Sequence, residues 1–188
     1  MTQSTRERVL RAAYACVARL GMAKTTMEDI AREAALSRAT LYRAFPGGRD
    51  EVLDATVVWE VARFFGRVST AIHPDELDTA AVLEQGLLAA REALEHHDLL
   101  QQLLRHEADQ LLPPLATVMP LVQAALADWF RPRLEAAVLR PGVDPAQAAD
   151  LVARMALSYL GSPGRWDLHD PEQVRRLVQE HLLAAIVA

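Results

Sequence analysis

The feature that most constrains the fold is a pair of short, capped helical patterns separated by only about two residues. The first pattern starts at Thr26, a typical N-cap residue, and places Asp29 three positions further on. The second starts at Ser37 and carries Leu41 and Phe45 on its inner face. So short a connection cannot bring the second helix back alongside the first, so the two helices must cross sharply. This is typical of a helix-turn-helix, in which the second helix enters the major groove of DNA.

The rest of the chain also has helical periodicity, interrupted by Pro and Gly. Apolar residues recur at three- and four-residue spacing, strand-like alternation is lacking, and aromatic residues make up only 5% of the sequence. We therefore predict an all-α fold of about nine helices, with a three-helix DNA-binding domain over residues 1–48 and an effector-binding and dimerisation domain over 49–188. Outside the pair at 26–45, helices are expected over about 4–20, 49–71, 76–96, 98–111, 114–139, 145–161 and 171–187, with a break at His73-Pro74.

Charge is divided unequally along the chain. Residues 1–49 contain nine Lys or Arg and four Asp or Glu, which gives a net charge of +5, so the other 139 residues of this chain of net charge −5 carry −10. A basic N-terminal part on an acidic remainder is typical of a protein whose N-terminal part alone meets phosphates. The alternative is a helical ligand-binding or protein-interaction module with a purely structural helix-turn-helix, and such a module has no need of this division.

Catalytic and metal-binding patterns are not found in the sequence. Gly47-Gly48 joins two helices and lacks the Lys-Ser/Thr that follows a phosphate-binding loop. The histidines between residues 96 and 106 do not have metal-ligand spacing, and the single Cys16 excludes an internal disulfide. The uncharged run 110–127 contains three prolines, which favours a buried helix over a membrane span. We expect a cytoplasmic protein that is not an enzyme and needs no metal, cofactor or membrane.

Residues 21–53, GMAKTTMEDIAREAALSRATLYRAFPGGRDEVL, resemble the N-terminal domain of TetR-family transcriptional regulators. The shared features are a Thr-capped helix, an Ile-Ala pair, a Ser-capped helix with Thr-Leu-Tyr, and an aromatic residue before a short basic joint. The resemblance covers about the first 55 residues. It implies a homodimeric repressor that a small-molecule effector releases from a palindromic double-stranded DNA operator, although an activator remains open.

The resemblance also implies which residues contact DNA. Caps donate to phosphates, the outward face of the second helix meets the groove, and a basic residue begins helix four: Thr26, Ser37, Arg38, Ala39, Thr40, Tyr42, Arg43 and Arg49. The alternatives are that Tyr42 packs against the first helix and that Arg43 is only a solvated charge. Two positions depart from the family. Ala35 stands where a turn glycine is usual, and a left-handed conformation there costs alanine about 1 kcal/mol. Ala44 stands where histidine is common, so one DNA contact is missing.

For the rest of the chain the resemblance implies a pocket for a small apolar effector, with helices four and seven lining it. Residues of suitable chemistry there and nearby are Trp59, Phe64, Phe65, His106, Met119, Trp129 and Phe130. An ordinary hydrophobic core explains the same apolar residues, so both interpretations stand.

Dimerisation is expected through the last two helices, which each carry an apolar stripe. The predicted interface residues are Leu151, Val152, Met155, Tyr159, Val174, Leu177, Val178, Leu182 and Ile186. Two helices from each subunit would form a four-helix interface. The alternative is that both stripes are used within one chain.

Overall fold

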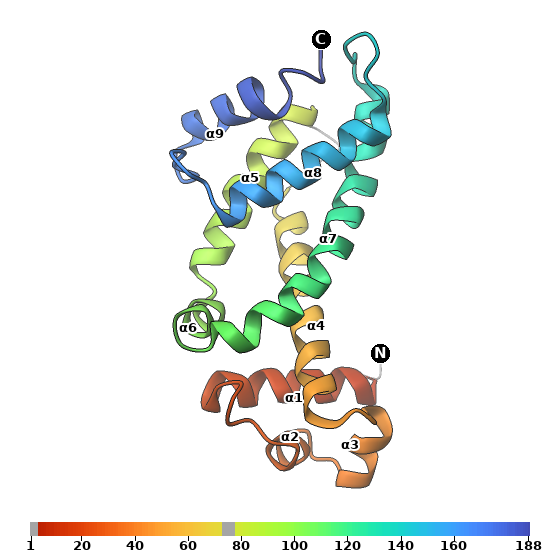
Figure 1. Ribbon diagram of the computed structural model, residues 1–188, viewed down its shortest axis with the longest axis vertical. Helices are drawn as coiled ribbons and strands as arrows, with labels where there is room; N and C mark the ends of the chain where they lie inside the picture. The colour runs from red at the N-terminus through yellow and green to blue at the C-terminus, as the bar shows by residue number, and fades with distance from the viewer. Residues whose placement is uncertain (1–3, 73–77) are drawn as a thin grey trace. The chain divides into compact units, whose positions relative to one another are not determined.

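The computed structural model describes residues 4–72 and 78–188, which form nine α-helices and one short π-helical segment (Figure 1). The all-α prediction is confirmed. The helices are α1 (Thr5–Leu20), α2 (Met27–Glu33), α3 (Arg38–Ala44), α4 (Gly48–Thr70), α5 (Thr79–Glu95), α6 (Asp98–His106), α7 (Ala108–Ala136), α8 (Pro145–Gly161) and α9 (Pro171–Leu177), and the π-helical segment is η2 (Val178–Leu182).

The chain forms two compact units. The head unit comprises Met1–Arg63 and His97–Val118, and the body unit comprises Phe64–His96 and Met119–Ala188. The division between the units falls inside α4 and inside α7, whereas the sequence led us to expect a domain boundary between residues 48 and 49. The head unit includes α6 and the first turns of α7 because Leu103 and Leu111 are buried in one cluster with Val17, Met22 and Leu53. No local sequence pattern predicts this long-range contact.

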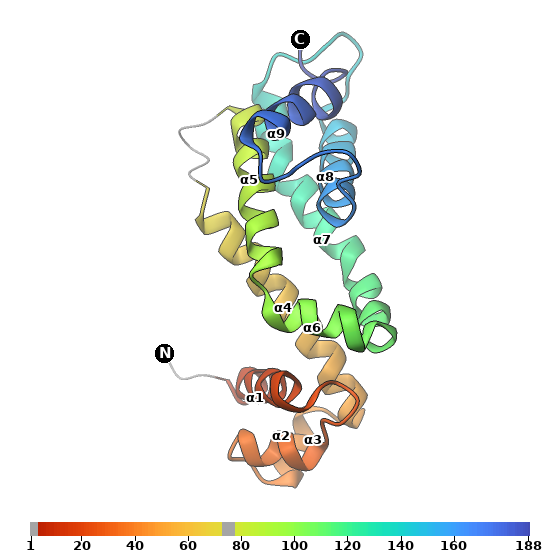
Figure 2. The same ribbon diagram turned by 90° about the vertical axis from the view of Figure 1, so that its left-hand side faces the viewer.

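The three N-terminal helices share a small core. In both views α2 and α3 lie on the same side of α1 (Figures 1 and 2). Val9 and Ala13 of α1, Ile30 of α2, Leu41 of α3 and Phe45 are completely buried in it. All five belong to the helical periodicities visible in the sequence, because adjacent short helices have few alternative surfaces on which to bury them.

The turn between α2 and α3 contains strained backbone. Ala35 has φ of 50°, the one positive φ outside glycine among the described residues. The N–H of Leu36 donates to the carbonyl of Ala31 at 3.0 Å, and that of Ala34 donates to Ile30 at 2.8 Å. These bonds end α2 with the left-handed residue that a helix C-terminus commonly uses. Alanine adopts this conformation at a cost, as its place in the sequence suggested.

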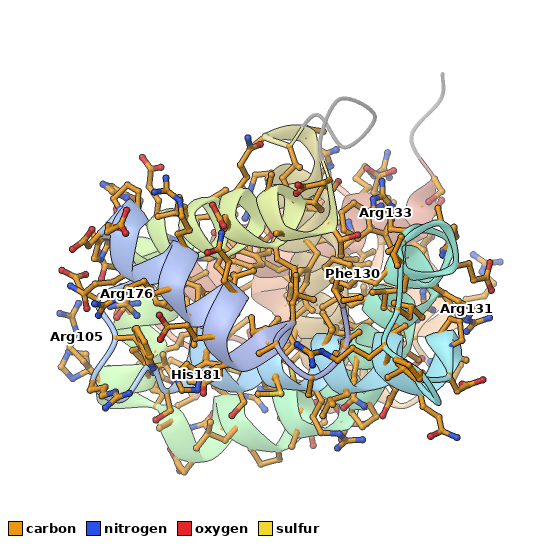
Figure 3. The ribbon with its side chains drawn as sticks, turned by 90° about the horizontal axis from the view of Figure 1, so that it is seen from above. Arg105, Phe130, Arg131, Arg133, Arg176 and His181 are labelled. Carbon is orange, nitrogen blue, oxygen red and sulfur yellow. The ribbon has the colours of Figure 1, made fainter. Side chains whose placement is uncertain are left out.

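The body unit has a core of its own, built from the end of α4, the second part of α7, and α5, α8, α9 and η2. Figures 1 and 2 show α5, α8 and α9 packed side by side. Leu134, Val152 and Val174 are completely buried in this core. Viewed from above, Phe130 lies among the helices, while the exposed Arg131 projects from their edge (Figure 3).

The helix boundaries differ from the prediction in three places. The chain bends at Glu107, not near residue 112, and α7 then continues through four prolines. The carbonyls that the prolines leave unpaired belong to exposed or half-exposed residues, where water replaces the missing donor. The final helix is α-helical only to Leu177, after which η2 and turns follow and Val187 pairs with Leu139 in an isolated antiparallel bridge. The predicted break at His73-Pro74 lies outside the described residues.

Candidate nucleic-acid interface

Helix α3 is fixed in place by its cap and by its buried side. The Ser37 hydroxyl accepts the backbone N–H of Thr40 at 3.1 Å, and the two hydroxyl groups lie 2.9 Å apart. Leu41 is completely buried and Phe45 follows it into the same core. Because the inner side is anchored in this way, the opposite side of α3 is held towards solvent in one orientation.

The outward side of α3 carries donors and no acid. Four of its residues are exposed: Arg38, Ala39, Tyr42 and Arg43. The exposed fraction of Tyr42 is 42%. The phenol ring is therefore not enclosed against α1, the alternative weighed from the sequence. Arg38 forms a 2.5 Å ion pair with Glu28 of α2. This arrangement presents the guanidinium and phenol groups that recognise base edges and phosphates.

The start of α2 is a reciprocal capping box. The Thr26 hydroxyl accepts the N–H of Asp29 at 3.2 Å and donates to the Asp29 carboxylate at 2.6 Å, and that carboxylate also accepts the N–H of Thr26 at 3.2 Å. The hydrogen bond from the Thr26 hydroxyl lowers the pKa of Asp29 below its ordinary value. A carboxylate at this position also complements the positive end of the helix dipole.

Arg49 has a role that the sequence did not reveal. Its guanidinium donates to the carbonyls of Thr25 at 2.8 Å and Met22 at 2.5 Å, and it pairs with Asp50 at 2.9 Å. Its side chain is 33% exposed. The phosphate contact expected from the resemblance stays a prediction, while the contacts observed within the chain hold the turn between α1 and α2.

Arg6 was also missed by the sequence analysis. From α1 its guanidinium lies 4.3 Å from the centre of the Phe45 ring and donates to the carbonyl of Ala44 at 3.2 Å. It therefore supports the last turn of α3, where a cation also complements the negative end of the helix dipole. In the sequence, Arg6 is only one of the nine basic residues in the segment 1–49.

The predicted effector residues fall into two groups. Phe64, Phe65, Trp129 and Phe130 belong to the body core, where Phe64 and Phe65 pack edge to face with ring centres 5.1 Å apart. Trp129 and Phe130 do the same at 4.9 Å. The remaining three predicted residues lie elsewhere: Trp59 packs against the head core, His106 is exposed on α6 and Met119 is half-buried on α7.

Trp59 belongs to the head unit because of its neighbours. Its ring packs edge to face with Tyr14 of α1 at 6.2 Å, and the Arg63 guanidinium lies 4.5 Å from its centre. The structure therefore brings four of the seven predicted effector residues into one apolar cluster and does not bring Trp59 into it.

The predicted dimer residues are also divided. Val152, Val174, Leu177, Val178, Leu182 and Ile186 are buried within the single chain. Leu151 is 44% exposed, and Met155 and Tyr159 are partly exposed. The predicted stripe of the last helical stretch, residues 174–186 of α9, η2 and the turn after it, thus serves the core of its own chain, the alternative that the sequence left open. One side of α8 keeps accessible apolar surface.

Together, a basic N-terminal segment of three helices and a separate helical body define a helix-turn-helix transcriptional regulator. The sequence profile of bacterial regulatory proteins of the tetR family matches residues 9–56, which contain the capped helices, the strained turn and the beginning of α4. The chain therefore carries the DNA-binding domain of the TetR family of transcriptional regulators. The predictions of this family and of a protein that is not an enzyme are confirmed.

Similarity extends beyond the head. An uncharacterised HTH-type transcriptional regulator of Mycobacterium tuberculosis (strain H37Rv) is 27% identical over 157 residues, which cover 82% of this chain and 79% of the relative. The structure of a SmeT–triclosan complex is similar with a TM-score of 0.59 and 27% identity, covering 99% of this chain and 93% of that one.

Two further comparisons concern the relatives and the fold. SmeT is the repressor of the multidrug efflux pump SmeDEF of Stenotrophomonas maltophilia. The R. erythropolis repressor QsdR matches with a TM-score of 0.63 at 19% identity, covering 98% of this chain and 96% of its own, which supports the fold.

One helix of the described residues, α7, is long and apolar enough to cross a membrane by length and composition alone. Leu111, Val118, Ala127, Phe130 and Leu134 of α7 are nevertheless buried inside the protein. In a soluble regulator of this family, these side chains make α7 in part a core helix.

Proposed function

We propose that the protein is a homodimeric repressor that binds a near-palindromic operator and leaves it when a small apolar effector binds. The observation that carries this proposal is the outward side of α3, where Arg38, Tyr42 and Arg43 are exposed. Helix α3 itself carries no acid, and Glu28 of α2 pairs with Arg38. The eight residues predicted to contact DNA remain our proposed interface. Arg49 is proposed to act there mainly by holding the turn that precedes α2.

Dimerisation supplies the second half-site. We assign the contact surface to the last two helices, with the exposed side of α8 at its centre, where Leu151 is 44% exposed and Met155 and Tyr159 are partly exposed. A twofold-symmetric homodimer would carry two α3 helices, one for each half-site of the operator.

Effector binding is assigned to the body unit. The edge-to-face aromatic pairs of α4 and α7 offer the apolar environment that a hydrophobic ligand requires. The complex of the related SmeT with triclosan, a small molecule, supports the same class of effector here. A cytoplasmic location, where operator and effector meet, belongs to the same proposal.

The DNA-binding part is tested by selecting ligands for the full-length protein from random double-stranded DNA. We expect enrichment of a near-palindrome whose half-sites lie about one helical turn or slightly more apart. Lack of enrichment over random DNA would support the interaction-module alternative. A single unrepeated site would contradict the proposed dimer geometry.

The effector part is tested with apolar compounds that raise the melting temperature of the protein. Linkage requires that effector and operator weaken each other by the same factor, typically about 5- to 150-fold. Operator affinity measured with and without each stabilising compound should fall by such a factor. Compounds that bind the body and leave operator affinity unchanged would remove the effector role and leave DNA binding intact.

A further inference from the structure

The turn between α1 and α2, residues 21–26, is held by two charged side chains from distant parts of the head unit. Glu107, at the bend between α6 and α7, accepts the backbone N–H of Ala23 at 2.7 Å. Arg49, in the first turn of α4, donates to the carbonyls of Met22 and Thr25. The Glu107 carboxylate accepts from a backbone N–H of the turn, whereas the Arg49 guanidinium donates to its backbone carbonyls. A carboxylate cannot donate and a guanidinium cannot accept, so neither side chain could replace the other.

The turn is shaped around the Glu107 carboxylate. Gly21 has φ of 86°, and a Cβ atom there would lie 2.3 Å from Glu107 Oε1. The side chain of Thr25 is completely buried and donates to the carbonyl of Gly21 at 2.7 Å. The absence of a side chain at residue 21 thus creates the space that the carboxylate occupies, which is a reason for glycine beyond its backbone conformation.

Apolar residues deliver Glu107 to this position. Leu103 and Leu111 lie four residues on either side of it and are buried in one cluster with Met22 of the turn, along with Val17 and Leu53. The N–H of Glu107 donates to the carbonyl of Leu103 at 2.7 Å, and its own carbonyl accepts from Leu111 at 3.1 Å. The bend between α6 and α7 is therefore anchored on both sides, and the carboxylate points into the turn with little freedom.

This contact fixes the start of α2, the first of the two helices of the helix-turn-helix. Residue 26 caps α2, and α2 packs directly on α3. A shift of the turn therefore moves the start of α2 and, with it, the orientation of α3. We propose that Glu107 is a positioning residue for DNA binding, which sets α2 and α3 in the geometry that fits the groove. This inference rests on the proposed operator binding.

The electrostatic effect of Glu107 by itself has the opposite sign. Removing a negative charge from a DNA-binding protein should strengthen its attraction to phosphates. A loss of affinity on removing Glu107 is therefore evidence for positioning and cannot come from charge. Glu135, an exposed acid in the last turn of α7, provides the matched control for removal of one negative charge.

The experiment measures affinity for the selected operator with the full-length protein, its Glu107→Ala and Glu107→Gln variants, and the Glu135→Ala control. We expect Glu107→Ala to lower operator affinity about tenfold, the order of effect of losing one hydrogen bond to a charged group. Glu107→Gln keeps an oxygen acceptor and should bind within about threefold of the unaltered protein. Helix content and the amount of operator bound at saturation should match between Glu107→Ala and Glu135→Ala, which separates positioning from unfolding.

Gly21→Ala provides an independent variant, because its methyl group occupies the place of the carboxylate. Part of its effect comes from backbone strain, which is present with or without Glu107. It should therefore weaken operator binding more in the unaltered protein than in the Glu107→Ala background, as for two residues in contact. If Glu107→Ala does not fold, Gly21→Ala in the unaltered protein decides the question: unchanged operator affinity would overturn the positioning role, and a loss of about tenfold at unchanged helix content would support it.

The outcomes separate the two proposals. If the unaltered protein selects no operator, the proposed function fails and takes this inference with it. If it binds an operator and Glu107→Ala matches Glu135→Ala within twofold, or the Gly21→Ala effect is the same in both backgrounds, the positioning role is overturned while operator binding stands.

Discussion

The three N-terminal helices and the body unit are both helical, but they differ in how apolar residues are used. In the first region Ile30, Leu41 and Phe45 all enter one small core, and the outward side of α3 is polar. In the body unit, Val174 of α9 is completely buried whereas Leu121 and Leu151 are 68% and 44% exposed. The difference teaches that local patterns decide where a helix lies along the sequence, while the neighbours it meets decide where its apolar side goes.

The largest expected effect concerns the stability that a buried side chain of the N-terminal core provides, compared with an exposed side chain of the body unit. Phe45→Ala removes a completely buried ring and should destabilise the protein by about 3–5 kcal/mol. Leu121→Ala, on the exposed side of α7, should change stability by no more than about 0.5 kcal/mol in the isolated chain. Denaturant unfolding measures both. A large loss with Leu121→Ala would show that the body covers this side chain with a second subunit.

The next prediction distinguishes Arg43, on the outward side of α3, from Arg49, which holds the turn before α2. Arg43→Ala should cost about 1–3 kcal/mol at one operator position and relax the base preference there. Arg49→Ala should weaken all sequences alike, because its guanidinium holds the backbone of the turn before α2. Binding to a library of operator variants measures both profiles. An unchanged preference in Arg43→Ala would remove this residue from the groove.

A smaller effect tests the strained turn of the head. Ala35 has φ of 50°, so Ala35→Gly should relieve strain and stabilise the protein by up to about 1 kcal/mol. The matched control is Ala62→Gly at an exposed position within α4, which should destabilise it by about 0.5–1 kcal/mol. Melting curves of the two variants should move in opposite directions. Equal shifts would indicate that the left-handed turn carries no strain.

The smallest effect concerns the cap of α2. Because the pKa of Asp29 is lowered in the folded protein, its ionised form stabilises the fold at pH values above the unfolded-state pKa of about 3.9. This stabilisation is lost as the pH falls through the lowered folded-state pKa. Asp29→Asn should therefore be less stable than the unaltered protein at neutral pH, with the difference shrinking in acid. A difference that is constant with pH would assign the effect to packing.

Much of the head could be predicted from the sequence because its signals are local. The caps at Thr26 and Ser37 and the left-handed turn at Ala35 each involve residues within a few positions of one another. The Arg49 contacts could not be predicted, because they join residues more than 20 positions apart in sequence through backbone carbonyls. The bend at Glu107 carries neither Gly nor Pro, and its reason lies 84 residues away at Ala23.

The body shows the same limit on a larger scale. Its helices could be located from periodicity and from caps such as Asp144 and Asp170. The partners of their apolar sides could not, because several packings use the same stripe. Thus Trp59 was grouped with Phe64 by proximity in sequence, although its ring packs against Tyr14.

The central claim is that the basic N-terminal part, residues 1–49, binds DNA through phosphates and bases while the acidic remainder of the chain does not. Salt dependence tests this claim most directly. The measurement is the affinity of the full-length protein for its selected operator between 50 and 200 mM salt, by fluorescence anisotropy. For about six phosphate contacts, the account predicts a fall of roughly 10³-fold or more, linear on logarithmic axes. A flat salt response would contradict it, because an N-terminal segment of net charge +5, residues 1–49, that binds DNA must displace counterions.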